Sequence, residues 1–136
     1  MKRLENKIAV ITGGADGLGR AASIKFTAEG ATVIIWDMNE EKGLLTVSEL
    51  EKEGGKAFFV KVNTASYSEV EAATQNAVGK FGRIDILINN AGITRDASIK
   101  KMTPDQWQQV IDVNLTGVFN CAKCISAGMV EKGYGR

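Results

Sequence analysis

The residue types best suited to chemistry gather in one short segment, Thr12-Gly13-Gly14-Ala15-Asp16-Gly17-Leu18-Gly19. The segment follows the apolar run 7–12 and precedes a helical pattern over residues 18–29. Glycines at positions 13, 17 and 19 let the chain turn sharply and let a bulky group approach the backbone. The start of the helix offers free N–H groups and a positive dipole end. The segment therefore predicts a pyrophosphate site for a dinucleotide, the alternative being a turn that only reverses the chain.

The spacing of the glycines separates this segment from two common phosphate-binding motifs. G-x-x-x-G-x-G differs from the G-x-G-x-x-G fingerprint of many dinucleotide-binding proteins. The segment also lacks the Lys-Ser/Thr pair that holds nucleoside triphosphates in a P-loop. A nucleoside triphosphatase is therefore disfavoured.

An acidic residue follows the second apolar run, where an adenosine ribose would lie. Asp37 comes 18 residues after Gly19, and its carboxylate can accept hydrogen bonds from both ribose hydroxyls. It would repel a 2′-phosphate, and Asp16 adds a second negative charge. Met38 supplies no compensating cation, and Arg20 is the only nearby base in the sequence. Unless Asp37 is an ordinary loop residue, this pattern predicts NAD as the cofactor, with NADH preferred over NADPH.

The composition of the 136-residue chain excludes several other classes of function. Seventeen Lys and Arg against 16 Asp and Glu leave a net charge of +1, so neither nucleic acid nor a membrane is expected as a partner. The absence of histidine excludes Ser-His-Asp triads and the common zinc and iron sites, and we predict no metal site. No apolar run approaches a membrane span or a signal sequence. Two cysteines cannot form a disulfide framework, so we expect a cytoplasmic protein.

Short apolar runs alternate with amphipathic stretches along the chain. The apolar runs predict strands at residues 7–12, 31–36, 57–62 and 84–88. The amphipathic stretches predict helices at residues 18–29, 39–53, 67–80 and 104 to about 133. Strands that are apolar throughout and alternate with helices indicate a parallel sheet covered on both faces. We predict a single α/β dinucleotide-binding domain over residues 1–136, a Rossmann-type parallel sheet of strand order 3-2-1-4.

The last predicted helix carries an apolar stripe at helical spacing, formed by Trp107, Val110, Ile111, Leu115, Val118 and Ala122. Asn114 falls within this stripe, and a buried amide needs hydrogen-bond partners. It is either a functional residue or an asparagine satisfied by local contacts. Cys121 and Cys124 form a C-x-x-C deep inside the same helix, not at the helix N-terminus that a redox pair needs, so we interpret them as inert thiols. Both tryptophans, Trp36 and Trp107, are interpreted as packing residues.

Two motifs together carry a resemblance to a known family. The glycine segment and Asn89-Asn90-Ala91-Gly92, which follows the fourth predicted strand, resemble the short-chain dehydrogenase/reductase family over essentially the whole chain. Residues 79–87, 92–96 and 112–119 are similar to the branch that contains 3-oxoacyl-[acyl-carrier-protein] reductases and acetoacetyl-CoA reductases. The resemblance implies NADH-dependent reduction of a 3-oxoacyl thioester, on acyl-carrier protein or coenzyme A. The alternatives are an NAD-dependent dehydrogenase of another secondary alcohol and a non-catalytic nucleotide-binding module.

The resemblance also implies roles for individual residues. Asn63 stands where the family usually has an aspartate facing the adenine amine, and the backbone of Thr64 would lie near the ring. Asn114 is the family's fourth catalytic position, which holds a water linked to the active-site lysine. The residues implied to bind the cofactor are Gly13, Gly14, Ala15, Asp16, Gly17, Leu18, Gly19, Asp37, Met38, Asn63, Thr64, Asn90, Ala91 and Gly92.

Part of the family's chemistry has no counterpart in these residues. The family uses a serine after its fifth strand and a Tyr-x-x-x-Lys, but Tyr67 is followed four places on by Glu71, and Tyr134 has no residue at that distance. We therefore expect the chain to be the N-terminal half of a reductase, without the catalytic half and inactive alone. Its fourth strand would be an exposed edge, so the isolated chain should associate or be poorly soluble. The resemblance implies a homotetramer for the parent protein.

Overall fold

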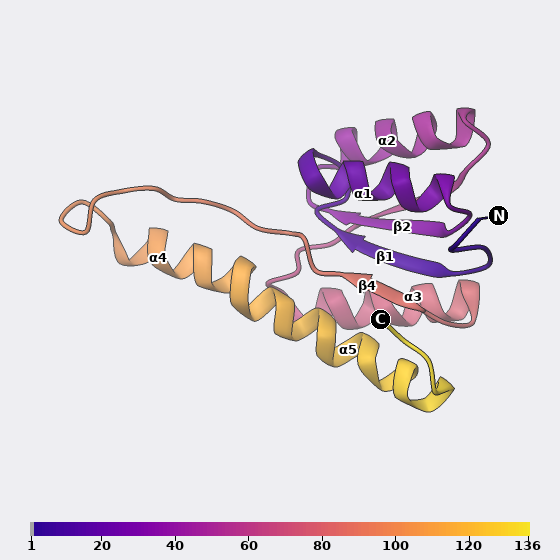
Figure 1. Cartoon of the computed structure of the whole chain (residues 1–136). Helices are drawn as coiled ribbons and strands as arrows, with labels where there is room; N and C mark the ends of the chain where they lie inside the picture. Colours follow the sequence, from indigo (N-terminus) through magenta and orange to yellow (C-terminus); the bar gives the residue numbers. More distant parts are fainter. Residues whose placement is uncertain (1) are drawn as a thin grey trace.

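A parallel four-stranded sheet forms the centre of the computed structural model, which describes residues 2–136. Its strands lie in the order β3 (Lys56–Lys61), β2 (Thr32–Asp37), β1 (Ile8–Thr12) and β4 (Ile86–Ile88). Helices α1 (Gly17–Ala28) and α2 (Glu40–Lys52) cover one face, and α3 (Tyr67–Phe81) and α5 (Gly117–Lys132) cover the other (Figure 1). The predicted fold class and strand order are confirmed.

The two faces of the sheet explain why its strands are apolar throughout. Along β1, Ala9 and Ile11 face α1 and α2, whereas Val10 faces α3 and α5. Along β2, Ile35 and Trp36 alternate in the same way, and both are fully buried. Successive side chains of a strand point to opposite faces, so a sheet covered on both sides buries every residue of its central strands. Trp36 is thus a packing residue, as predicted.

The fourth strand differs from its prediction in two respects. It is shorter than residues 84–88 and begins only at Ile86. Asp85, just before it, is buried and contacts the start of β1, where its Oδ2 accepts a hydrogen bond from Ile8 N at 2.9 Å. The free edge of β4 is also partly covered, which the sequence did not predict. Leu87 N donates to Arg136 O at 2.9 Å, and Arg136 N donates to Asp85 O at 3.0 Å. The C-terminal residues thus add backbone pairing beside β4 (Figure 1).

The predicted helix from residue 104 is interrupted. It consists of α4 (Pro104–Ile111), a π-helical turn η1 (Asp112–Thr116) and α5. Thr103 caps α4 by accepting a hydrogen bond from Gln106 N at 3.2 Å, and Pro104 occupies the first turn, as expected from the sequence. A π turn contains an extra residue, so the faces before and after it lose the common helical register.

The predicted apolar stripe on this helix is not the buried face. Trp107 is 60% exposed and Leu115 is 64% exposed, so the interpretation of Trp107 as a packing residue was wrong. The reason is that α4 projects beyond the sheet and runs beside the extended loop that precedes it (Figure 1). The helix is buried only along α5, at Gly117, Asn120, Cys121 and Ile125. None of the helices in residues 2–136 is long and apolar enough to cross a membrane.

A pair of glycine substitutions tests the packing of α2 on the sheet. A Cβ at Gly43 would lie 2.2 Å from the ring of Phe59 on β3, whereas a Cβ at Gly79 on α3 would meet nothing within 4 Å. We expect Gly43→Ala to destabilise the protein by about 1–3 kcal/mol through overpacking. Gly79→Ala should stabilise it by about 0.5–1 kcal/mol through lower backbone entropy of the unfolded chain. Urea denaturation of both variants measures the change in the free energy of unfolding. If both substitutions changed it in the same direction, this account of the packing would be contradicted.

Candidate functional site

A pocket of about 380 Å³ opens where the strands end at their carboxyl side. Ten of the fourteen residues predicted to bind the cofactor lie in its wall: Gly13, Asp16, Gly17, Asp37, Met38, Asn63, Thr64, Asn90, Ala91 and Gly92. The remaining wall residues are Trp36, Val62, Ile93 and Val113. The other four predicted residues, Gly14, Ala15, Leu18 and Gly19, belong to the same glycine loop but lie outside the wall. In an open parallel sheet, ligands bind in a crevice at this end of the strands.

The glycine loop requires glycine for two different physical reasons. Gly13 and Gly17 have φ angles of +63° and +53°, in the left-handed region that favours glycine. Gly19 instead lies where the helix start meets the loop, and a Cβ there would fall 2.0 Å from Gly13 O and 2.5 Å from Asn90 Nδ2. The loop can therefore pack against the turn after β4 only without side chains at Gly13 and Gly19. This close approach leaves the backbone exposed toward the pocket.

Thr12 and Asn90 tie the ends of β1 and β4 together. The Thr12 hydroxyl accepts hydrogen bonds from Asn90 N and Ala91 N, both at 3.0 Å, and donates to Ile88 O at 3.3 Å. In return, Asn90 Nδ2 donates to Thr12 O at 3.1 Å and to Gly13 O at 3.3 Å. The hydroxyl thus uses its donor and both acceptor sites. Thr12 builds the site although it was predicted only as part of the motif.

A buried serine supports the glycine loop from beneath. Ser23 is fully buried on α1, and its hydroxyl lies 3.1 Å from Gly14 O and 3.0 Å from Gly19 O. These contacts hold both ends of the loop against the helix. Sequence reasoning missed Ser23, although a small polar residue on the inner face of a predicted helix is a usable signal of such a contact.

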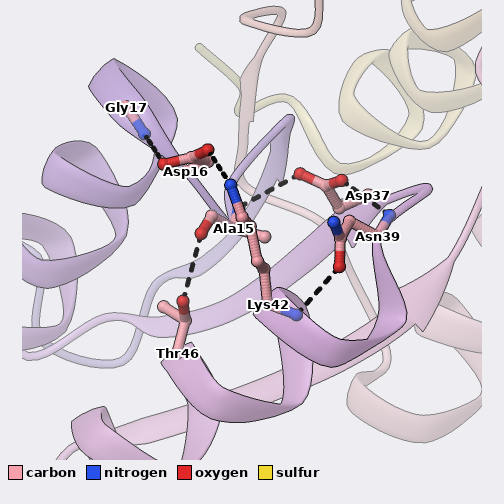
Figure 2. A network of polar contacts seen from close by, with 7 residues as sticks. All are labelled: Ala15, Asp16, Gly17, Asp37, Asn39, Lys42 and Thr46. Atoms are coloured by element: carbon pink, nitrogen blue, oxygen red, sulfur yellow. Dashed lines mark hydrogen bonds and ion pairs between the residues drawn. The ribbon is translucent and has the colours of Figure 1, made fainter.

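Asp37 holds the glycine loop while it faces the pocket. Its Oδ2 accepts a hydrogen bond from Ala15 N at 3.2 Å, and its Oδ1 accepts one from Asn39 N at 2.9 Å. Thr46 Oγ1 donates to the carbonyl of the same Ala15 at 3.3 Å (Figure 2). A carboxylate has about four lone-pair sites, so Asp37 keeps acceptor capacity for a ligand.

The charges around Asp16 differ from the prediction. Asp16 caps α1 by accepting a hydrogen bond from Gly17 N at 2.9 Å, and it forms an ion pair with Lys42 Nζ at 2.5 Å (Figure 2). The hydrogen bond between the two side chains is the main reason that the pKa of Asp16 is lowered and that the pKa of Lys42 is raised. Arg20, predicted as the only nearby base, instead pairs with Glu49 on α2. Lys42 was missed because it is 26 residues from Asp16 in the sequence.

The loop after β3 forms a further wall of the pocket. Asn63 Oδ1 accepts a hydrogen bond from Ala65 N at 3.1 Å, which leaves one lone pair of this amide oxygen for a ligand. Thr64 O accepts a hydrogen bond from Asn120 Nδ2 at 2.9 Å, and Asn120 is only 3% exposed. A Cβ at Gly117 would lie 2.8 Å from Thr64 Oγ1, so α5 packs closely against this loop. Asn120 was missed, although an asparagine on the inner face of a helix signals a buried polar contact.

The comparisons with known proteins identify the family. The family described as short chain dehydrogenase matches residues 7–136. The chain belongs to the short-chain dehydrogenase family. Over 133 residues it is 41% identical to a 3-oxoacyl-[acyl-carrier-protein] reductase, FabG, of Thermotoga maritima, covering 98% of this chain and 54% of that protein. It is 39% identical to a 3-oxoacyl-[acyl-carrier-protein] reductase of Synechocystis sp., covering 100% of this chain and 56% of that protein.

A solved structure has the same backbone arrangement. An NAD⁺-bound xylitol dehydrogenase superimposes with a TM-score of 0.95 at 29% identity, covering 99% of this chain and 52% of that one. The chain spans about half the length of the curated relatives that it matches.

Asn114, for which the family resemblance implies a catalytic role, is not buried as predicted. It is exposed in the π-helical turn, where its Oδ1 accepts a hydrogen bond from Ile93 N at 2.8 Å and its Nδ2 donates to Ile93 O at 3.0 Å. The amide therefore finds its partners in the loop after β4 and not inside a helix interface. The loop after β4 is the element that contacts Asn114, and this contact leaves the residue exposed.

The remaining candidate groups have no contact with the pocket. Burial raises the pKa of the Cys121 thiol to about 12, with a smaller contribution from Cys124, so this thiol stays protonated at neutral pH. Both cysteines are free.

Within residues 2–136, no group of three or more His, Cys, Asp or Glu side chains could hold a metal ion. The pocket wall formed by these residues also contains no tyrosine or lysine.

The Thr12 brace can be tested by removing its hydroxyl. Thr12 is 1% exposed, so Thr12→Val would leave the N–H groups of Asn90 and Ala91 without their acceptor. We expect a loss of about 1–3 kcal/mol in the free energy of unfolding, measured by urea denaturation. Thr12→Ser keeps the hydroxyl and serves as the control, with a smaller loss. If the Thr12→Val protein were as stable as the Thr12→Ser protein, the hydroxyl would not be what ties β1 to the turn after β4.

Proposed function

We propose that the protein containing this chain is an NAD(H)-dependent oxidoreductase that reduces a 3-oxoacyl thioester to its 3-hydroxyacyl form. Residues 1–136 are then its dinucleotide-binding domain. The observation that carries the proposal is the meeting of the glycine loop, Asp37 and the Asn90 turn around one pocket. The two 3-oxoacyl-[acyl-carrier-protein] reductases that are about 40% identical support the substrate class.

The donors and acceptors of the pocket suit the parts of a dinucleotide. The start of α1 presents free N–H groups to a pyrophosphate, and Gly17 has open space where a Cβ would be. Asp37 offers acceptor oxygens to an adenosine ribose, and Asn63 offers one to an adenine amine. The buried indole N–H of Trp36, a residue of the wall, has no hydrogen-bond partner in the described chain. Because this N–H is itself buried, it presents no donor at the surface of the pocket.

This arrangement suggests which step of the proposed reduction each group would support. When bound, the nicotinamide supplies the hydride that reduces the ketone carbon. The turn Asn90-Ala91-Gly92 would lie beside the nicotinamide ribose, and Asn114 would hold the next loop through Ile93. We propose that the residue that protonates the ketone oxygen lies outside residues 1–136, because the pocket wall contains no tyrosine or lysine.

Two other functions remain as alternatives. The similarity to an NAD⁺-bound xylitol dehydrogenase favours an NAD-dependent dehydrogenase of another secondary alcohol. A non-catalytic nucleotide-binding module would require the 136 residues to be the complete natural product. The intact mass of the native protein, compared with its reading frame, separates the module from the enzymes. Comparing the turnover of acetoacetyl-CoA with the turnover of a panel of secondary alcohols distinguishes a 3-oxoacyl thioester reductase from a dehydrogenase of another secondary alcohol.

We further propose a homo-oligomer, a tetramer in the parent protein. The exposed apolar side chains on and beside α5 support this assembly, among them Trp107, Leu115 and Phe119 at 59–64% exposure. A cytoplasmic location accompanies the proposal, because a reducing compartment suits the free thiols. The net charge of +1 offers no basis for nucleic-acid binding.

Cofactor preference tests the role of Asp37. The protein should use NADH at least about tenfold more efficiently than NADPH, since each 1.4 kcal/mol of charge repulsion at the 2′-phosphate is worth tenfold. Asp37→Ala removes the carboxylate and should narrow this ratio, whereas Glu51→Ala, an exposed acid outside the pocket wall, should leave it unchanged. Steady-state kcat/KM values with both cofactors measure the ratio. Equal or better efficiency of the unmodified protein with NADPH would contradict the proposed preference.

Residues 1–136 alone should not turn over acetoacetyl-CoA with either cofactor. They contribute no Tyr-x-x-x-Lys, and general acid catalysis typically supplies about 10²–10⁴-fold in rate. The measurement is NADH consumption by the purified chain after removal of host reductases, with the full-length protein as the positive control. Persistent turnover would place the acid within these residues.

A further inference from the structure

The ion pair between Asp16 and Lys42 stands at the rim of the pocket and joins two elements that the glycine loop separates. Asp16 belongs to the start of α1 and lies in the pocket wall, and Lys42 belongs to the first turn of α2 (Figure 2). Their Nζ–Oδ2 distance is 2.5 Å. Both side chains are more than half exposed, and exposed ion pairs contribute little to stability. The pair therefore contributes little to folding, and its effect is on the local charge at the rim of the pocket.

Lys42 stands at an unfavourable place for a cation. Its own N–H donates to the Asn39 cap at 3.0 Å, so it lies in the first turn of α2, where the helix dipole is positive. The ammonium instead lies against Asp16, and the charge of Asp37 adds to the rise of its pKa. The Lys42 ammonium thus interacts electrostatically with both carboxylates at this end of the pocket. No residue that lines the pocket in the described part of the chain carries a positive charge.

The consequence is a charge balance at the adenosine end of the site. Two carboxylates and one ammonium leave one net negative charge there. Neutralising Asp16 would remove a charge that repels a 2′-phosphate and would also release an ammonium that can attract one. Neutralising Lys42 would have the opposite effect, because both carboxylates would then be uncompensated. Arg20 cannot replace Lys42, since its guanidinium is held by Glu49.

We propose that Lys42 is a positioning residue for cofactor specificity. Held by Asp16, it is kept from serving as the counter-ion of a 2′-phosphate, so that Asp37 controls recognition of the adenosine ribose. This inference rests on the proposed function and deepens it. The sequence pattern assigned the preference to Asp16 and Asp37 acting together as bare negative charges. In the structure the ion pair with Lys42 offsets the charge of Asp16, which leaves Asp37 as the uncompensated carboxylate at this end of the pocket.

Binding measurements on the full-length protein test this without any turnover. The probes are NADH and NADPH, titrated by nicotinamide fluorescence, and the readout is the ratio of their dissociation constants. Asp16→Asn is suited to the purpose, because asparagine caps a helix as well as aspartate and only the charge is lost. We expect it to shift the ratio toward NADPH by about tenfold, the order of effect of one unit charge at an exposed site.

Four further variants make the result specific to the ion pair. Lys42→Gln, which leaves the α1 cap intact, should shift the ratio toward NADH. The double variant Asp16→Asn/Lys42→Gln restores the original net charge and should return the ratio to that of the unmodified protein. Lys42→Arg should keep that ratio. Lys52→Gln, an exposed lysine at the other end of α2 and outside the pocket wall, is the matched control and should have no effect.

The possible outcomes separate the two proposals. If Asp16→Asn and Lys42→Gln each change both dissociation constants by the same factor, the role of Lys42 in specificity is wrong while dinucleotide binding stands. A shift in the Asp16→Asn protein that persists undiminished in the double variant also overturns it, because Lys42 is then not involved. If the unmodified protein binds neither dinucleotide, the proposed function fails and this inference fails with it. A shift that shrinks in 1 M salt supports the charge mechanism, since the Debye length falls to about 3 Å.

Discussion

The close contact between the glycine loop and the turn after β4 is the constraint on which the rest of the site depends. Gly19 has no room for a side chain, because a Cβ would overlap Gly13 O and Asn90 Nδ2. The Thr12 hydroxyl holds the two segments at this separation through three hydrogen bonds. Once they are held, the start of α1 and the ends of β1 and β4 must face the same pocket. The site is therefore a consequence of how tightly two backbones pack.

A second feature is the separation of donors from acceptors around this contact. The start of α1 contributes N–H groups and the positive end of a dipole, whereas the end of β2 contributes the Asp37 carboxylate. Asp37 is itself fastened to the loop through Ala15 N, so the acceptor cannot move independently of the donors. A ligand with a pyrophosphate beside a ribose suits this order of groups. The ion pair of Asp16 with Lys42 then tunes the charge at the same place.

The second half of the chain supports the pocket through side-chain amides that bond to the backbone of its loops. Asn120 reaches from α5 to the carbonyl of Thr64, and Asn114 reaches from the π-helical turn to both backbone groups of Ile93. Each amide thus fixes a loop that a strand alone would leave unsupported. The free edge of β4 takes up backbone bonds from Arg136. The exposed apolar residues of α4 and α5 remain as surface available for assembly.

The sequence by itself determined the parallel α/β sheet, its strand order, the glycine loop and the place of Asp37. These features depend on local patterns, namely apolar runs, helical spacing and the requirement for glycine at positive φ. Only the tertiary structure decided that Lys42 neutralises Asp16, that Asn120 supports Thr64 and that Asn114 is exposed. Each of these depends on a contact between residues distant in the chain, or on whether another element covers a helix face. No local pattern records such a contact, because it arises only when the strands and helices pack.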